Sequence, residues 1–141
     1  MDRGANSQLV QEMIVRSPLG ALLGMEVETL EVDHVRVRLP FRPALTTGAD
    51  LVHGGATCAL IDTAATAAAW SGDDLGRNPR GTTIALTVNF LAPARGQDIV
   101  AEARVIQRGR TITVCEVSVE SRAGQRVASA LVTYKLSAAE S

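Results

Sequence analysis

Aromatic residues, lysine and clustered positive charge are all scarce in this sequence. Phe, Trp and Tyr together make up 3% of the 141 residues, so the core must be built from aliphatic side chains and alanine. Lys135 is the single lysine, the net charge is −1, and the arginines form no basic block. Because nucleic-acid binding needs clustered cations, we expect no nucleic-acid partner.

Cysteine and histidine are too few and too scattered to indicate a metal site. Cys58 and Cys115 match no zinc-ligand spacing, and His34 and His53 add no cluster. We therefore expect no metal and no redox cofactor. Residues 1–7 are mostly polar rather than a charged-then-apolar leader, so the expected compartment is the cytoplasm, with both thiols reduced.

The pattern of the sequence, 46% hydrophobic and 21% charged, predicts one globular domain. Helical spacing over 6–16 ends at Ser17-Pro18, and alternation predicts a hairpin over 25–39. A long helix is expected over 54–71, then a loop over 72–80 and strands at 82–91, 98–107, 111–120 and 126–136. Since strands and helices do not alternate after residue 80, the prediction is an α+β fold with an antiparallel sheet. We divide it into an N-terminal helical extension (1–19) and the main domain (20–141).

Asp62 is the only charged residue between His53 and Asp73. A carboxylate is costly to bury and aspartate is a poor helix former, so its place in an apolar helix suggests chemistry. A membrane span is not expected, because the segment is rich in Ala and Gly, carries this acid at its centre and lacks cationic anchors. A helix that is apolar all round can instead be the central helix of a soluble core.

The start of the same helix suits a reaction at a carbonyl group. Water attack on a carbonyl group develops negative charge on oxygen, which backbone N–H groups at a helix N-terminus can stabilise. Gly54 and Gly55 lie at such a terminus and have no side chain to block an acyl group. A carboxylate such as Asp62, which loses hydration in an apolar helix, becomes a stronger base.

Several stretches together resemble a known family. The run Leu51-Val52-His53-Gly54-Gly55 is followed by Asp62, nine residues after the histidine. Residues 82–94 read TTIALTVNFLAPA, 109–111 read GRT and 127–130 read VASA. Over residues 20–136 this pattern resembles the hot-dog thioesterases of the phenylacetate-degradation (PaaI-like) type.

The resemblance implies a hot-dog fold, with an antiparallel sheet wrapped around the helix 54–71, and hydrolysis of an acyl-coenzyme A thioester. Coenzyme A enters only as part of the substrate, and no cofactor is implied. A homo-oligomer is also implied, a dimer or homotetramer whose site takes the acid from one chain and the glycine N–H from another. That answers a geometric objection, because residues 54 and 62 are about 12 Å apart along one helix.

By the same resemblance, Gly54 supplies the oxyanion N–H, His53 orients the thioester and Asp62 is base or nucleophile. Thr66 lies one turn beyond Asp62 on the same face, at a helper position, and Thr83 matches a hydroxyl that orients water. The implied substrate-binding residues are Gly55, Asn89, Arg108, Gly109 and Arg110.

One position departs from the family pattern, and several alternatives stay open. Thr47 stands where the family usually has Asn or Gln as a carbonyl partner, and its reach is shorter. The chain could therefore be a non-catalytic acyl-coenzyme A binding or sensing protein. A dehydratase would need a catalytic histidine in a different motif. Asp62 could instead form an ion pair with Arg77 or Arg80. Cys58 reads as a small core residue, and Arg108 and Arg110 could simply be solvated.

Overall fold

The structure is a computed structural model that describes residues 3–72, 75–76 and 78–138. It opens with a helical segment made of α1 (Arg3–Leu9), η1 (Val10–Val15) and α2 (Pro18–Leu23). The sequence predicted an α-helix over 6–16, but η1 is a π-helix. Its wider i→i+5 turn puts Val10 and Val15, five residues apart, together in the core. Pro18 then starts α2, and the Ser17 side chain caps it by accepting from the Gly20 N–H.

A six-stranded antiparallel sheet is the largest element of the fold. Its strands are β1 (Glu26–Glu31), β2 (His34–Leu39), β5 (Arg80–Phe90), β6 (Ile99–Arg108), β7 (Ile112–Ser121) and β8 (Arg126–Ser137), and their order is β1-β2-β6-β7-β8-β5. Each predicted strand is present within two residues of its expected ends. Alternation explains the register, since Val35, Val37 and Leu39 of β2 are buried while the residues between them are not.

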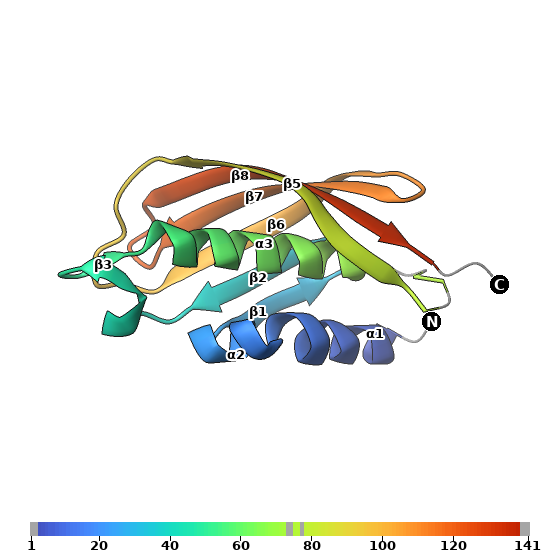
Figure 1. Cartoon of the computed structure of the whole chain (residues 1–141), viewed down its shortest axis with the longest axis horizontal. Helices are drawn as coiled ribbons and strands as arrows, with labels where there is room; N and C mark the ends of the chain where they lie inside the picture. Colours follow the sequence, from blue (N-terminus) through green and yellow to red (C-terminus); the bar gives the residue numbers. More distant parts are fainter. Residues whose placement is uncertain (1–2, 73–74, 77, 139–141) are drawn as a thin grey trace.

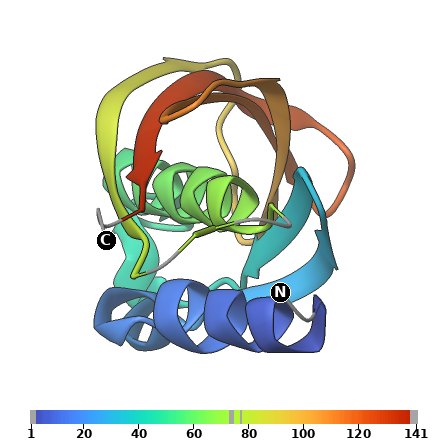
Figure 2. The same ribbon diagram turned by 90° about the vertical axis from the view of Figure 1, so that its right-hand side faces the viewer.

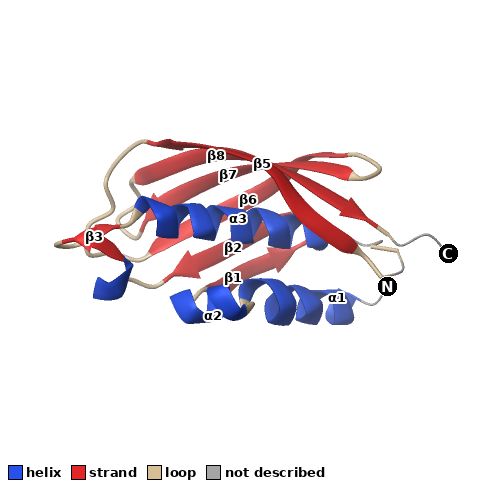
Figure 3. Cartoon of the chain, viewed as in Figure 1, coloured by secondary structure: helices blue, strands red, loops and turns tan. Residues whose placement is uncertain are grey.

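The long helix α3 (Gly54–Trp70) lies in the hollow of the sheet, as predicted. Figure 2 shows the sheet curving over α3, with the N-terminal helices closing the open side below. Figure 3 shows the same three layers of helix, helix and sheet. The core that α3 shares with the sheet combines larger aliphatic side chains with many small ones, which are fully or almost fully buried: Ala64, Ala65, Ala67 and Ala68 on the helix, and Ala101, Ala103, Ala128 and Ala130 on the sheet.

The segment before α3 contains more structure than the predicted loop over 44–52. It has a 3-10 turn, η2 (Pro43–Leu45), and a two-stranded ribbon, β3 (Thr46–Gly48) paired with β4 (Leu51–Val52). Gly48 and Ala49 both have positive φ, at 139° and 52°, which makes this reversal tight. The ribbon lies at the end of the molecule where α3 begins (Figure 1).

One edge of the sheet is left unpaired in the single chain. The edge strand β5 bonds only to β8, and its large apolar side chains remain open. Ile84 and Phe90 are each 55% exposed, and Leu86 is 37% exposed. The sequence placed these residues with Val88 on one strand face; Val88 is partly buried against the core, whereas the other three remain open in the single chain. None of the described helices is both long and apolar enough to cross a membrane.

Candidate active site

The start of α3 is capped by the histidine that precedes it. His53 is the N-cap residue, and its ring Nδ1 accepts a hydrogen bond of 2.7 Å from the Gly55 N–H. This bond requires an unprotonated Nδ1, so a neutral ring carries its proton on Nε2. The cap occupies the Gly55 N–H, whereas no described residue accepts a hydrogen bond from the Gly54 N–H. Gly54 therefore has the donor that is free for a ligand at the positive end of the helix.

The space beside Gly54 is open. A Cβ atom at this residue would meet only the ring of Phe90, at an ordinary 3.4 Å. Gly54 opens into a cavity of about 390 Å³, which we call the Gly54 cavity. Thr47, the residue that departs from the family pattern, lines the same cavity. The structure thus brings Thr47 and Gly54 together. The other residues that line the Gly54 cavity include Leu51, Thr57, Phe90 and Leu91.

Asp62 lies two turns further along α3 and is half-buried, and among the residues that the structure describes its carboxylate has one hydrogen-bond partner. The hydroxyl of Thr83 on β5 donates to Asp62 Oδ1 over 2.6 Å. Such a charge-assisted bond holds the carboxylate in one orientation and leaves the second oxygen for other contacts. Among the residues that the structure describes, Asp62 forms no ion pair, so Arg80 is not its partner. The other alternative, Arg77, lies outside the described residues.

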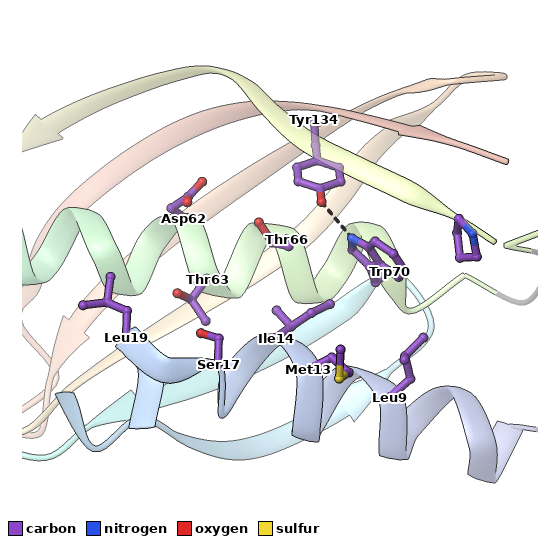
Figure 4. A pocket seen from close by; sticks show the side chains of 11 residues that line it. Leu9, Met13, Ile14, Ser17, Leu19, Asp62, Thr63, Thr66, Trp70 and Tyr134 are labelled. Carbon is purple, nitrogen blue, oxygen red and sulfur yellow. Dashed lines mark hydrogen bonds between the residues drawn. The ribbon is translucent and has the colours of Figure 1, made fainter. Parts of the chain in front are cut away.

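Asp62 opens into a different and larger cavity, the Asp62 cavity, of about 570 Å³. Figure 4 shows it between α3 and the N-terminal helices. From α3 it is lined by Asp62, Thr63, Thr66 and Trp70. Thr66 is therefore brought into the same space as Asp62, at the helper position that the sequence predicted.

The far end of the Asp62 cavity is formed by Trp70 and Tyr134. The indole Nε1 of Trp70 donates to the Tyr134 hydroxyl over 2.8 Å. Burial raises the pKa of Tyr134 above its ordinary value; the bond from Trp70 opposes this rise, and the charge of Asp62 adds to it. The phenol is thus neutral at physiological pH, and its hydroxyl serves as an acceptor for Trp70.

The predicted coenzyme A contacts lie at the other end of α3. Arg108 donates to the carbonyl oxygens of Ala68 and Ala69 and pairs with Asp33 over 2.7 Å. A cation here complements the helix dipole, so Arg108 has a structural task of its own. Arg108, Gly109 and Arg110 line one cavity of about 230 Å³, so the three stay together as a predicted contact group.

Asn89 and Cys58, two further residues that the sequence singled out, line neither the Gly54 cavity nor the Asp62 cavity. Asn89 is exposed on the edge strand β5 and points to the opposite face from Phe90. Cys58, which the sequence suggested as a small core residue, is only partly buried and lies outside the core cluster. Burial raises the pKa of its thiol, which makes a thiolate nucleophile less accessible. No group of three or more His, Cys, Asp or Glu residues within the described chain could hold a metal ion.

Sequence reasoning picked out Thr66 and Thr83 but missed other residues around Asp62. Tyr134 and the N-terminal residues Met13 and Ile14 line its cavity but carry no local motif. The available signal was weak: Trp70 and Tyr134 are the only residues of their kinds in an aromatic-poor chain. The direct bond between Thr83 and Asp62 joins residues 21 positions apart, and no spacing rule for the sequence encodes it.

Comparison with known proteins assigns the chain to a family. The profile of the thioesterase superfamily matches residues 49–128, which include the start of α3, Asp62 and Thr83. A Halobacterium salinarum protein named as an esterase is 38% identical over 114 residues, 79% of this chain and 75% of the relative. The medium/long-chain acyl-CoA thioesterase YigI of Escherichia coli (strain K12) is 29% identical and covers 90% of this chain and 91% of its own.

A solved structure agrees with these sequence relatives. A thioesterase family protein from Silicibacter pomeroyi superposes with a TM-score of 0.85 at 29% identity, over 95% of this chain and 99% of that one. The predicted hot-dog architecture, an antiparallel sheet around one long helix, is confirmed by this match. The chain belongs to the thioesterase superfamily.

Proposed function

We propose that this protein is an acyl-coenzyme A thioesterase of the PaaI-like type, with an active site that forms between two copies of the chain. The observation that carries the proposal is the separation of its two reactive groups. Within one copy, Asp62 and the free Gly54 N–H open into different cavities and lie about 12 Å apart along α3. One carbonyl cannot contact both, but a carbonyl placed between two antiparallel copies of α3 can.

The open edge strand supports the same assembly. β5 presents unpaired backbone groups and exposed apolar residues, including Phe90 beside Gly54 and Ile84 near Thr83. An uncovered edge of this kind invites a second strand, and a two-fold pair of β5 strands would extend the sheet. Pairing there would also bring the Gly54 cavity of one copy towards Asp62 of the other. A dimer is therefore the smallest assembly we propose, and a tetramer would pair such dimers.

Two chemical routes fit Asp62. In the first, Asp62 takes a proton from water while the water oxygen bonds to the acyl carbon. The C–S bond then breaks, and the coenzyme A thiolate leaves and takes up a proton. In the second, an Asp62 oxygen attacks the acyl carbon and expels the thiolate, and water hydrolyses the resulting anhydride to restore the carboxylate. Neither route needs a metal or redox cofactor, and in both the Gly54 N–H stabilises the oxyanion.

The neighbouring residues support this chemistry in specific ways. Thr83 holds one Asp62 oxygen and keeps lone pairs that can also accept from a water molecule. His53, fixed by its cap, presents its Nε2–H rather than a base. Thr47 shares the Gly54 cavity and can donate a second bond to the carbonyl. We also propose Thr66 as a helper of Asp62. The other proposed substrate contacts are Gly55, Asn89, Arg108, Gly109 and Arg110.

Complementation between two inactive variants tests both parts of the proposal. Asp62→Asn and Gly54→Ala are each expected to lower hydrolysis of acyl-coenzyme A esters strongly, as followed by release of free thiol. If the site is shared, a mixed dimer contains one intact site, formed by Asp62 of one chain and Gly54 of the other. Chains that are unfolded and refolded together in equal amounts should then recover about a quarter of the wild-type rate.

Three outcomes would contradict the proposal. Full activity of Asp62→Asn would remove Asp62 from the mechanism. Failure of the mixed protein to regain activity, although mass spectrometry shows mixed dimers, would place the whole site within one copy. Wild-type protein that binds acyl-coenzyme A esters but never releases thiol would instead indicate the acyl-coenzyme A sensor.

A further inference from the structure

The Asp62 cavity changes character along its length. At one end lie the Asp62 carboxylate and, one turn on, the Thr66 hydroxyl; at the other lies the Trp70 indole. Residues 62, 66 and 70 are spaced four apart and so follow one face of α3. Figure 4 shows Leu19 near the acid end and Leu9 and Met13 near the indole. The cavity is therefore a channel that leads from a reactive group to an apolar end.

Among the described residues, the far end of this channel is lined mainly by apolar side chains. The indole N–H of Trp70 and the hydroxyl of Tyr134 are bonded to each other over 2.8 Å. The Trp70 donor is therefore used, and apart from the Tyr134 O–H the surfaces left to contact a ligand are ring carbons and the side chains of Leu9 and Met13. A ligand gains by burying apolar surface there and loses by bringing a charge.

The length of the channel sets the size of that ligand. The helical step from Asp62 to Trp70 corresponds to about 12 Å along α3. An extended chain advances about 1.2 Å per bond, as a fully extended backbone does, so this distance fits about eight to ten carbons. The cavity volume of about 570 Å³ is in the range of sites for small organic ligands.

We propose that the N-terminal helical segment forms one wall of the acyl pocket and that the protein selects unbranched aliphatic acyl groups of about eight to ten carbons, with Met13 and Trp70 limiting their length. This inference rests on the proposed function, because Asp62 marks where the thioester carbonyl lies. Met13 is the residue that can be changed most freely, since it is 67% exposed in the single chain and contributes little to the core.

A series of straight-chain acyl-coenzyme A esters from two to sixteen carbons tests the inference with two readouts. One is kcat/KM of the wild-type protein, and the other is Kd for the Asp62→Asn variant measured by calorimetry. Each added methylene should improve both values by about fourfold up to eight to ten carbons. Longer chains and phenylacetyl-coenzyme A should be poorer.

Met13 variants then move the optimum. Met13→Trp fills the apolar end, so the ten-carbon ester should lose at least about tenfold while the four-carbon ester is unchanged. Met13→Ala opens it and should lengthen the optimum by about two carbons. Leu22→Ala is the matched control, because Leu22 is 69% exposed on α2 and lies outside the cavity lining.

The two proposals fail in different ways. If wild-type protein hydrolyses the esters but the optimum stays fixed in both Met13 variants, or if phenylacetyl-coenzyme A is preferred, the pocket inference is wrong while the thioesterase stands. If no ester is hydrolysed but Kd still peaks at eight to ten carbons and shifts with Met13, the pocket inference stands and the proposed function fails.

Discussion

Thr83→Val removes the hydrogen bond from Thr83 to the Asp62 carboxylate while keeping the shape of the side chain. The Thr83 hydroxyl donates to Asp62 over 2.6 Å, and hydrogen bonds to charged groups contribute about 1.5–3 kcal/mol. If that energy orients Asp62 for attack, its loss should lower kcat/KM by about 10- to 150-fold. The fold should persist, because a methyl group replaces a hydroxyl on an edge strand and Asp62 stays open to water in its cavity.

Initial rates of thiol release, with circular dichroism to confirm folding, measure this effect. Thr83→Ser restores the hydroxyl and should recover most of the rate. Thr82→Val changes an exposed neighbour and should leave the rate at the wild-type value. A Thr83→Val protein with the wild-type rate would show that the bond is structural only. A Thr83→Ser protein as slow as Thr83→Val would show that a hydroxyl at this position does not restore the rate, and would refute the argument from the hydrogen bond.

Three other substitutions give distinct results. In Gly54→Ala the added methyl group meets only the Phe90 ring, so the free energy of unfolding should change by less than about 0.5 kcal/mol. The same methyl group enters the space meant for the acyl group, so kcat/KM should fall at least about tenfold. A loss of activity that is matched by a loss of stability would contradict a ligand role for Gly54. Gly81→Ala would overlap the Tyr134 hydroxyl and should cost about 2–4 kcal/mol in urea unfolding; a stable variant would refute the close contact. Hydrogen bonds from the Phe41 N–H and from Arg122 lower the pKa of Asp98 below 3.8 in the folded protein. The wild-type protein should therefore be more stable than Asp98→Asn above pH 3.8, and this difference should vanish as the pH falls through the lower folded pKa. A difference that is constant with pH would contradict that assignment.

The elements of the fold could be predicted because their signals are local. Alternation at Val35, Val37 and Leu39 defines β2, and the glycine pair after His53 defines the start of α3. What the sequence did not reveal depends on contacts between distant segments. The π-turn of η1 is explained only when Val10 and Val15 are both seen against the core. The ribbon of β3 and β4 depends on a turn with positive φ at Ala49, a residue that seldom adopts it.

The candidate site divides in the same way. Asp62, His53 and Gly54 could be picked out because an isolated acid and a glycine-rich helix start are unusual in sequence. The partner of Asp62 could not, since Thr83 reaches it only after β5 crosses to the far edge of the sheet. The Trp70–Tyr134 hydrogen bond could not be predicted either, because it joins α3 to the last strand. That Gly54 rather than Gly55 has the free N–H became clear only from the structure, where the Gly55 N–H donates to His53.

The alanine contact between α3 and the sheet has a consequence for how this protein can diverge. Ala64 and Ala101 are fully buried, so a larger side chain at either would overpack the core that positions the α3 wall of the pocket. The outer wall, formed by exposed residues such as Met13 and Leu19, carries no such constraint. Changes in substrate range should therefore accumulate in the first twenty residues, while the centre of the fold stays the same.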